Sequence, residues 1–401
     1  MKRFKHFLLG FVAGALVFTS PQVKAFDGLQ TIKVLFSNIP IYIDGNRVEL
    51  SHKAILHEGT TYLPMRDIAE ALGKEVLYNN NTKEIYIYEK EGKNSDKSNT
   101  KTDNNDLSRN QQISGEFSVN GIALGDSAED VSDVLGEPNR QDVSEYGFTW
   151  YIYNKDYSNY MQVGIKDNKV VALYTNSVSN WNFKKGIRFG STAASVRKAY
   201  GQPLSFIQKG QYRFYFNYKK GEAETYSIDD AFVTFFYDIH NNQTVTSILI
   251  IDKNTELSHE SLYGEASEEL RTAYTYQIFD LTNAVRVRNG LKALTWDEQA
   301  AKSSYLHSKD MAENNFFDHD NLKGEDPFDR MKKQGIHFMI AGENIAGGQT
   351  NAIYAHEGWM NSKGHRENIL FENFERLGVG VYFGGRYKIY YTQNFYTPLK
   401  R

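Results

Sequence analysis

One segment of the sequence recurs at an offset of 65 residues, and this repeat constrains the fold more than any other feature. Gly121, Gly125, Gly136 and Pro138 return as Gly186, Gly190, Gly201 and Pro203. In each copy a hydroxyl residue, Ser127 or Thr192, precedes a short helical pattern and can cap its free amide groups. The Gly-x-Pro element then ends the helix. Residues 115–252 are therefore predicted to hold two α+β units packed as one pseudo-symmetric domain.

The composition favours strands around these helices and several domains along the chain. A length of 401 residues exceeds what one hydrophobic core usually serves. The chain contains 27 Tyr and 25 Phe, and aromatic residues are enriched in strands. The fold class is thus predicted to be multidomain α+β. Since residues 115–252 show no cluster of titratable groups at catalytic spacing, we interpret them as a scaffold or binding module.

The first 25 residues have the pattern of an export signal peptide. A basic start is followed by an apolar run over residues 7–18 and a small-residue cleavage site at Val23-Lys24-Ala25. The run is shorter than the roughly 20 residues of a spanning helix, so cleavage is favoured over a retained anchor. The chain has no cysteine, which excludes disulfides, thiol chemistry and a lipoprotein anchor. We therefore predict a secreted protein with no stable membrane span after cleavage, extracellular or held non-covalently at the wall of a Gram-positive bacterium.

Residues 28–90 are predicted to form a small β-rich domain, and residues 91–112 a disordered linker. The segment Thr60–Arg66 and the following Ala69–Gly73 resemble the small domain named after the N-terminus of copper amine oxidases. His52 and His57 are too isolated to predict a copper site. The linker is rich in Lys, Asn, Asp, Ser and Thr and has no aromatic residue, so it cannot bury enough apolar surface to fold.

Residues 268–398 are predicted to form helices followed by a β-hairpin. Apolar spacing and stop signals predict helices over 268–289, 298–313 and 326–334, and a fourth that carries His356 and ends at 362–366. Thr295-x-x-Glu298 has the pattern of a capping box and is expected to begin the second helix. Strands at 377–383 and 387–395 flank a Gly-Gly turn.

Several motifs in this last region resemble the CAP superfamily of secreted proteins. They occur in order over some 125 residues as Phe316-Phe317-Asp318-His319, Gly342-Glu343-Asn344-Ile345-Ala346, Trp359-Met360-Asn361-Ser362, Gly364-His365-Arg366 with Asn368-Ile369-Leu370, and Gly378-Val379-Gly380. The resemblance implies an α-β-α sandwich for residues 268–398. The repeat region, with Tyr146–Tyr151 and Val163–Val170, is similar to the CAP-associated N-terminal domain of bacilli and their relatives.

The resemblance also implies a cleft built around His319, Glu343 and His365. Members of the superfamily typically place two His and two Glu there. The first His, first Glu and second His fall on these three residues, whereas the position of the second Glu is Ser362. Glu357 and Glu367 lie close in sequence and are candidates to substitute for it.

Such a trio permits metal chemistry. Two neutral imidazoles, His319 and His365, can hold zinc or another divalent metal with positions left for water or substrate. A carboxylate beside them, Glu343, can orient an imidazole or act as a general base. The alternative is that all three residues only join loops by hydrogen bonds across the cleft.

Other residues of the region are predicted to be structural. His307 is expected to be a core histidine or to support the cleft, Trp359 to pack beneath the His365 segment, and Asn344 to fix the Glu343 loop through backbone hydrogen bonds. His337 and His356 are assigned no role.

Two functions compete for this cleft. The first is a non-enzymatic binding protein for a wall, lipid or protein ligand. The second is a metal-dependent hydrolase of peptide or wall bonds, with Glu343 as the base. A third possibility is that residues 115–252 recognise the ligand and the C-terminal domain does not. The formal net charge of -3, without a basic stripe, argues against nucleic acid as a partner.

Overall fold

The structure is a computed structural model, and it describes residues 115–399 except 217, 218 and 220, together with short segments between 35 and 89. The predicted signal peptide and the linker at 91–112 lie outside these residues. Contacts divide the chain into two units, residues 1–101 and 102–401, and each is taken by itself. No helix in the described part of the chain combines the length and apolar character that a membrane crossing requires.

The first unit consists of short strands and one helix. Its elements are β1 (Leu35–Ser37), β2 (Ile41–Ile43), β3 (Asn46–Val48), β4 (Ala54–His57), β5 (Thr60–Tyr62), α1 (Met65–Ala71), β6 (Lys74–Tyr78) and β7 (Ile85–Glu89). The strands pair antiparallel as β1-β4-β5, β2-β3 and β6-β7. This arrangement agrees with the predicted β-rich character of the segment.

The second unit opens with an antiparallel sheet of seven strands in the order β16-β17-β18-β12-β11-β10-β9. The elements of this half are β8 (Phe117–Val119), α2 (Ala128–Leu135), β9 (Arg140–Val143), β10 (Thr149–Tyr153), the 3₁₀ turn η1 (Tyr157–Asn159), β11 (Met161–Lys166), β12 (Lys169–Thr175), β13 (Trp181–Phe183), α3 (Ala193–Tyr200), β14 (Phe206–Lys209), β15 (Tyr212–Tyr215), β16 (Ala223–Ile228), β17 (Ala231–Asp238), β18 (Thr244–Asp252) and α4 (Lys253–Ser258).

The two sequence repeats meet at the middle of this sheet. The last strand of the first copy, β12, pairs antiparallel with the last strand of the second copy, β18. Ser127 caps α2 and Thr192 caps α3 through the predicted side-chain bonds, and Gly136 and Gly201 follow the helices with φ of 76° and 83°. The repeat therefore produces one continuous sheet related by pseudo-symmetry about the β12–β18 pair.

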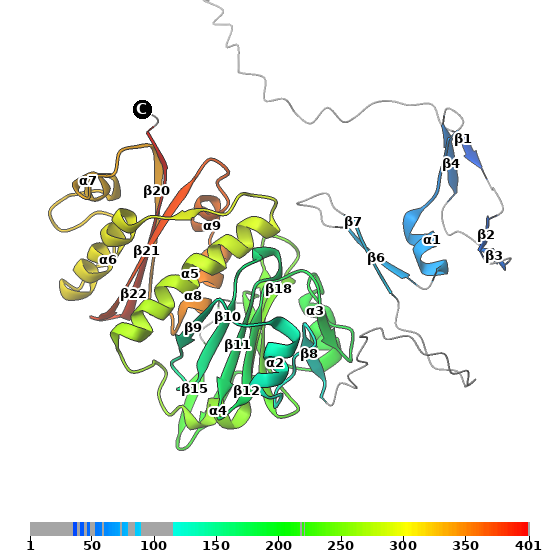
Figure 1. Ribbon diagram of the computed structural model, residues 1–401, viewed down its shortest axis with the longest axis horizontal. Coiled ribbons are helices and arrows are strands. Elements are labelled where there is room, and N and C mark those ends of the chain that lie inside the picture. The colour runs from blue at the N-terminus through cyan, green and yellow to red at the C-terminus, as the bar shows by residue number, and fades with distance from the viewer. Residues whose placement is uncertain are drawn as a thin grey trace, which may run out of the picture. The chain divides into compact units, whose positions relative to one another are not determined.

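The remaining half of the second unit is an α-β-α sandwich (Figure 1). Its elements are α5 (Glu268–Arg288), β19 (Thr295–Trp296), α6 (Glu298–Glu313), α7 (Pro327–Lys333), β20 (Phe338–Gly347), α8 (Ala352–Asn361), α9 (Lys363–Ile369), β21 (Arg376–Gly384) and β22 (Lys388–Pro398). The sheet order is β19-β21-β22-β20. The predicted multidomain α+β fold with a C-terminal sandwich is thus confirmed.

Two glycines of β21 bring α6 directly onto the sheet. A Cβ atom at Gly378 would lie 2.0 Å from the Ala301 nitrogen, and one at Gly380 2.0 Å from the Tyr305 nitrogen. No larger residue fits there. The close approach lets the hydroxyls of Ser304 and Ser308 donate to the carbonyls of Gly378 and Gly380, each at 3.0 Å. Helix and sheet are therefore fixed in register.

The seven-stranded sheet and the sandwich share one hydrophobic core. Trp150 and Tyr174 from the sheet belong to the same buried cluster as Ile278 of α5 and Trp359 of α8. Figure 1 shows α5 running between the two sheets. Polar contacts reinforce the junction, since buried Asp280 of α5 accepts hydrogen bonds from Arg140 (2.7 Å), Asn154 (2.8 Å) and Tyr157 (2.9 Å). The two halves thus form one packed body.

Three local expectations were wrong. The helix predicted over 298–313 is α6, but its cap is Asp297, which accepts from the Ala300 amide, and not Thr295, which lies in β19. The helix carrying His356 ends at Asn361, and a separate helix, α9, carries His365. Residues 342–346 form part of strand β20 rather than a loop.

Candidate functional site

Glu343 is the centre of the candidate site. It lies on β20, and its carboxylate is buried, with 1% of the side chain exposed. Arg330 of α7 donates to Oε2 at 2.7 Å, and His319 Nδ1 lies 2.9 Å from Oε1. In the orientation that satisfies both of its amide atoms, Asn394 of β22 also donates to Oε2, at 3.1 Å. A buried carboxylate needs such partners, because an unpaired charge in the interior is costly.

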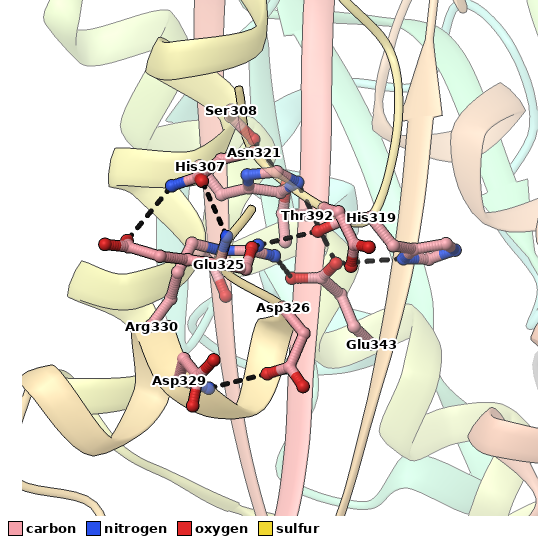
Figure 2. A network of polar contacts seen from close by, with 12 residues as sticks. His307, Ser308, His319, Asn321, Glu325, Asp326, Asp329, Arg330, Glu343 and Thr392 are labelled. Atoms are coloured by element: carbon pink, nitrogen blue, oxygen red, sulfur yellow. Dashed lines mark hydrogen bonds and ion pairs between the residues drawn. The ribbon is translucent and has the colours of Figure 1, made fainter. Parts of the chain in front are cut away.

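His319 is held by both its ring and its backbone. The segment that carries it follows α6, and Arg330 donates to the His319 carbonyl at 2.6 Å. Because a carboxylate oxygen only accepts, the His319 Nδ1 must donate to Glu343, which leaves Nε2 for a ligand. The side chain is 46% exposed. Figure 2 shows Glu343 between His319 on one side and Arg330 on the other.

His307 lies beside the Glu343 carboxylate and holds the segment that precedes His319. Its ring on α6 is fully buried, and Nε2 donates to the Asp318 carbonyl at 3.0 Å while lying 3.8 Å from Glu343 Oε1. Burial lowers the pKa of His307, which keeps the ring neutral at physiological pH. This placement agrees with the predicted supporting role.

His365 stands on α9, which is tied to β20 by asparagines. Asn344 donates to the His365 carbonyl at 3.1 Å, and Asn368 donates to Asn344 Oδ1 at 2.9 Å and to the Glu343 carbonyl at 3.1 Å. Asn344 therefore fixes α9, not a loop at Glu343 as expected. The pKa of His365 is lowered by burial and next by the nearby positive charge of His319.

The position of the second glutamate and the two candidates to replace it are all accounted for by other contacts. Ser362 lies at the junction between α8 and α9 and makes no side-chain cap bond. Glu357 points to the seven-stranded sheet, where Tyr174 (2.9 Å) and Ser247 donate to it. Glu367 is exposed and lies 3.9 Å from Lys363. Neither glutamate substitutes for the missing one in this geometry.

Arg330 and Asn394 were missed by the sequence reasoning. Arg330 falls in the last turn of a short helix, where a basic residue ordinarily only complements the helix dipole. Asn394 lies in the second strand of the predicted hairpin, but the pairing of this strand with β20, which sets Asn394 opposite Glu343, was not predicted. A pattern of residues along one chain carries no signal for either contact, because both join elements that are distant in sequence.

His319 is expected to titrate above its ordinary pKa of 6.5, because its hydrogen bond to Glu343 favours the protonated ring. A pKa raised in the folded state stabilises the fold fully below about pH 6.5, and the gain is lost as the pH rises through the raised value. Glu343→Gln should return the pKa towards or below 6.5. Titration of the His319 ring proton by NMR measures this directly, and an unchanged pKa in Glu343→Gln would contradict the assigned pair.

Comparison with known proteins places this chain and its fold in a family. The model described as the cysteine-rich secretory protein family matches residues 279–395, that of the CAP-associated N-terminal domain matches 124–262, and that of the copper amine oxidase N-terminal domain matches 18–112. The chain belongs to the cysteine-rich secretory protein, or CAP, family.

Among relatives, the chain is 34% identical over 291 residues to YlbC of Bacillus subtilis, described as an uncharacterized membrane protein, covering 68% of this chain and 82% of YlbC. It is 46% identical over 114 residues to YkwD of the same organism, covering 28% of this chain and 44% of YkwD. A crystal structure of an extracellular protein containing an SCP domain from Bacillus anthracis matches with a TM-score of 0.62 at 30% identity, over 75% of this chain and 99% of that one.

A cysteine-rich secretory protein from Staphylococcus aureus shares the fold, with a TM-score of 0.54 at 18% identity over 68% of this chain and 91% of that one.

Proposed function

We propose that the protein is an extracellular binding protein that captures a wall, lipid or protein ligand at the cleft lined by His319 and His365. Support for the extracellular setting comes from the Bacillus anthracis structure, which matches over nearly its whole length and is described as extracellular. YlbC is described as a membrane protein, and that description applies to YlbC alone.

The observation that supports binding over hydrolysis is the state of Glu343. A general base needs an oxygen within hydrogen-bond reach of the water that it deprotonates. Both Glu343 oxygens already accept, from His319 on one side and from Arg330 and Asn394 on the other. The carboxylate therefore acts to orient His319, and the imidazoles are the groups left to face a ligand.

The chemistry of the two rings defines the kind of ligand. His319 has a free Nε2 and a half-exposed ring, and its raised pKa makes it a charged donor in slightly acidic conditions. His365 Nδ1 is buried and has no hydrogen-bond partner among the described residues, so a ligand would meet the remaining part of this half-buried ring. Together the rings suit hydroxyl, amide and acidic groups, which wall polymers, lipid headgroups and proteins all present.

A divalent metal fits this donor set poorly. No cluster of three His, Asp or Glu side chains that could hold an ion occurs in the part of the chain that the structure describes. Two imidazoles remain, whereas zinc sites in proteins usually use three or four protein ligands. Zinc binding stays a prediction, which titration calorimetry with the full chain can test.

Hydrolysis remains the second candidate because the His319–Glu343 pair is the kind of arrangement that activates an imidazole as a base. In that case His319, rather than Glu343, would take the proton of a water molecule. The family fold does not decide between the two functions, since function depends on the site.

The test is a pulldown of the mature chain on purified Bacillus subtilis walls and on phosphatidylglycerol vesicles. The double variant His319→Ala/His365→Ala is expected to lose at least about tenfold in affinity for whichever surface retains the wild type. His337→Ala, an exposed histidine of the same sandwich, is the matched control and should bind normally.

Unchanged retention of the double variant would move recognition away from the cleft, with residues 115–252 as the next candidate. Release of peptide or sugar fragments from the walls by the wild type, abolished in the double variant, would replace the binding function by hydrolysis.

A further inference from the structure

We propose that a second ligand site lies between the seven-stranded sheet and the sandwich, in a cavity of about 520 Å³ that would take a neutral, largely apolar small molecule carrying one hydrogen-bonding group. None of the residues of the His319 cleft lines this cavity. The site is therefore independent of the proposed function.

The cavity lies where the shared core opens. One wall is the face of β16–β18 together with the β14–β15 hairpin, and the other is the segment from the end of β20 into α8. Protein interiors pack as densely as organic crystals, so a space of this size is uncommon between two packed elements. Its volume falls within the range of small-molecule sites, which occur preferentially at such interfaces between domains.

A glycine in the middle of α8 keeps the space open. A Cβ atom at Gly358 would have nothing within 4 Å, although the residues before and after it are buried. Glycine inside a helix is less stable than alanine by about 1 kcal/mol. The sequence thus carries a local cost at a position where a side chain would enter the cavity.

Charges in the lining indicate a neutral occupant. Lys209 and Glu256 form an ion pair at 2.6 Å, with 6% and 10% of their side chains exposed, and Lys209 also donates to the His259 carbonyl at 2.9 Å. Because each compensates the other, neither is left for a charged ligand. Burial raises the pKa of Glu357 and favours its neutral form. Half-buried Glu222 would repel an anion, which leaves a cation as the competing occupant that the test has to distinguish from a neutral one.

Two polar atoms in the wall supply the hydrogen-bonding function. His259 Nε2 and Gln349 side-chain oxygen are buried and have no hydrogen-bond partner among the described residues. Buried polar atoms are rarely left unpaired, so each needs an explanation. A hydroxyl group on the ligand would satisfy either of them. The rest of the lining is rich in aromatic rings, including Phe236 and Tyr354, which offer apolar surface to the ligand body.

Access to the cavity is provided at its rim. Tyr215 and Leu262 belong to the lining and remain 64% and 49% exposed. The lining therefore reaches solvent at these residues. A small molecule therefore needs no separation of the two halves to enter.

The test uses N-phenyl-1-naphthylamine, a neutral probe that fluoresces in apolar surroundings, with the full chain. Wild type is expected to give saturable binding. Gly358→Leu, which fills the space, should weaken it by at least about tenfold, whereas Gly358→Ala should retain it. Gly364→Leu is the matched control, since Gly364 is a helical glycine with open surroundings outside the lining.

The class of ligand is tested by displacing the probe with 1-octanol, octanoate or octylammonium, which share one chain length and differ in charge. Octanol should displace it at the lowest concentration. Tighter displacement by either ion would overturn the neutral occupant.

Absence of saturable binding by the wild type, or full binding by folded Gly358→Leu, would overturn the site itself. If Gly358→Leu does not fold, Ala223→Leu fills the space from the opposite wall and replaces it in the test. A crystal structure of the wild type with the probe gives an independent check. A probe bound elsewhere contradicts the proposal.

Discussion

Replacing Arg286 with alanine is expected to lower the free energy of unfolding by about 3–5 kcal/mol. The side chain is fully buried, and its guanidinium donates to the carbonyls of Lys292 (3.0 Å), Ile369 (2.8 Å), Phe371 (2.8 Å) and Phe374 (3.4 Å). Alanine would leave these carbonyls without a donor and create a cavity. Burial lowers the pKa of Arg286 to about 10, so the group is still charged at neutral pH.

The loss should appear as a lower urea midpoint with an unchanged slope. Arg271→Ala on the same helix is the control. Arg271 pairs at 2.7 Å with Glu268, whose side chain is 76% exposed, and such surface pairs contribute no more than about 1 kcal/mol. A midpoint for Arg286→Ala equal to that of the control would show that water replaces the lost bonds.

Replacing Arg330 with methionine is expected to have an effect of similar size and a functional consequence. The change leaves the Glu343 carboxylate buried without its cation, which typically costs about 3–5 kcal/mol. It also removes the bond to the His319 carbonyl, so the ring loses its fixed position. We expect both a lower urea midpoint and weaker ligand retention.

A double variant separates charge from packing. Arg330→Met with Glu343→Gln removes the buried charge and should recover part of the stability while leaving ligand retention impaired. Lys333→Ala on the same helix is the control, because Lys333 is 59% exposed and pairs with Glu325 at the surface. If the double variant is no more stable than Arg330→Met, the carboxylate charge is not the source of the cost.

The sequence predicts those features that depend on local or periodic signals. Such features follow from residues within a few positions of one another. They include the caps at Ser127 and Thr192, the long helix from Glu268, and the glycine ends of α2 and α3. The contact of His319 with Glu343 was expected only through the family resemblance, since nothing in their spacing along the chain requires it.

The remaining features depend on contacts that no local pattern encodes. Thr295 has the residues of a capping box, but its pairing with Arg376 holds it in a strand, so Asp297 takes the cap. Glu357 is close to Ser362 in sequence, yet the seven-stranded sheet supplies its partners. Likewise, His356 was given no role, and the structure buries it completely.

The core shared by the seven-stranded sheet and the sandwich has a consequence for how the chain evolves and unfolds. Two family models match residues 124–262 and 279–395 separately, so the two segments are separate modules in evolution. The two segments are not separate in their packing. Trp150 and Ile278 lie in the same buried cluster, and Asp280 accepts hydrogen bonds from residues on the other side of the boundary. Unfolding of one half would expose the apolar surface of the other half to water. We therefore expect the two halves to unfold as a single cooperative unit. A recombination event that exchanged either module alone would have to bring a matching apolar face with it.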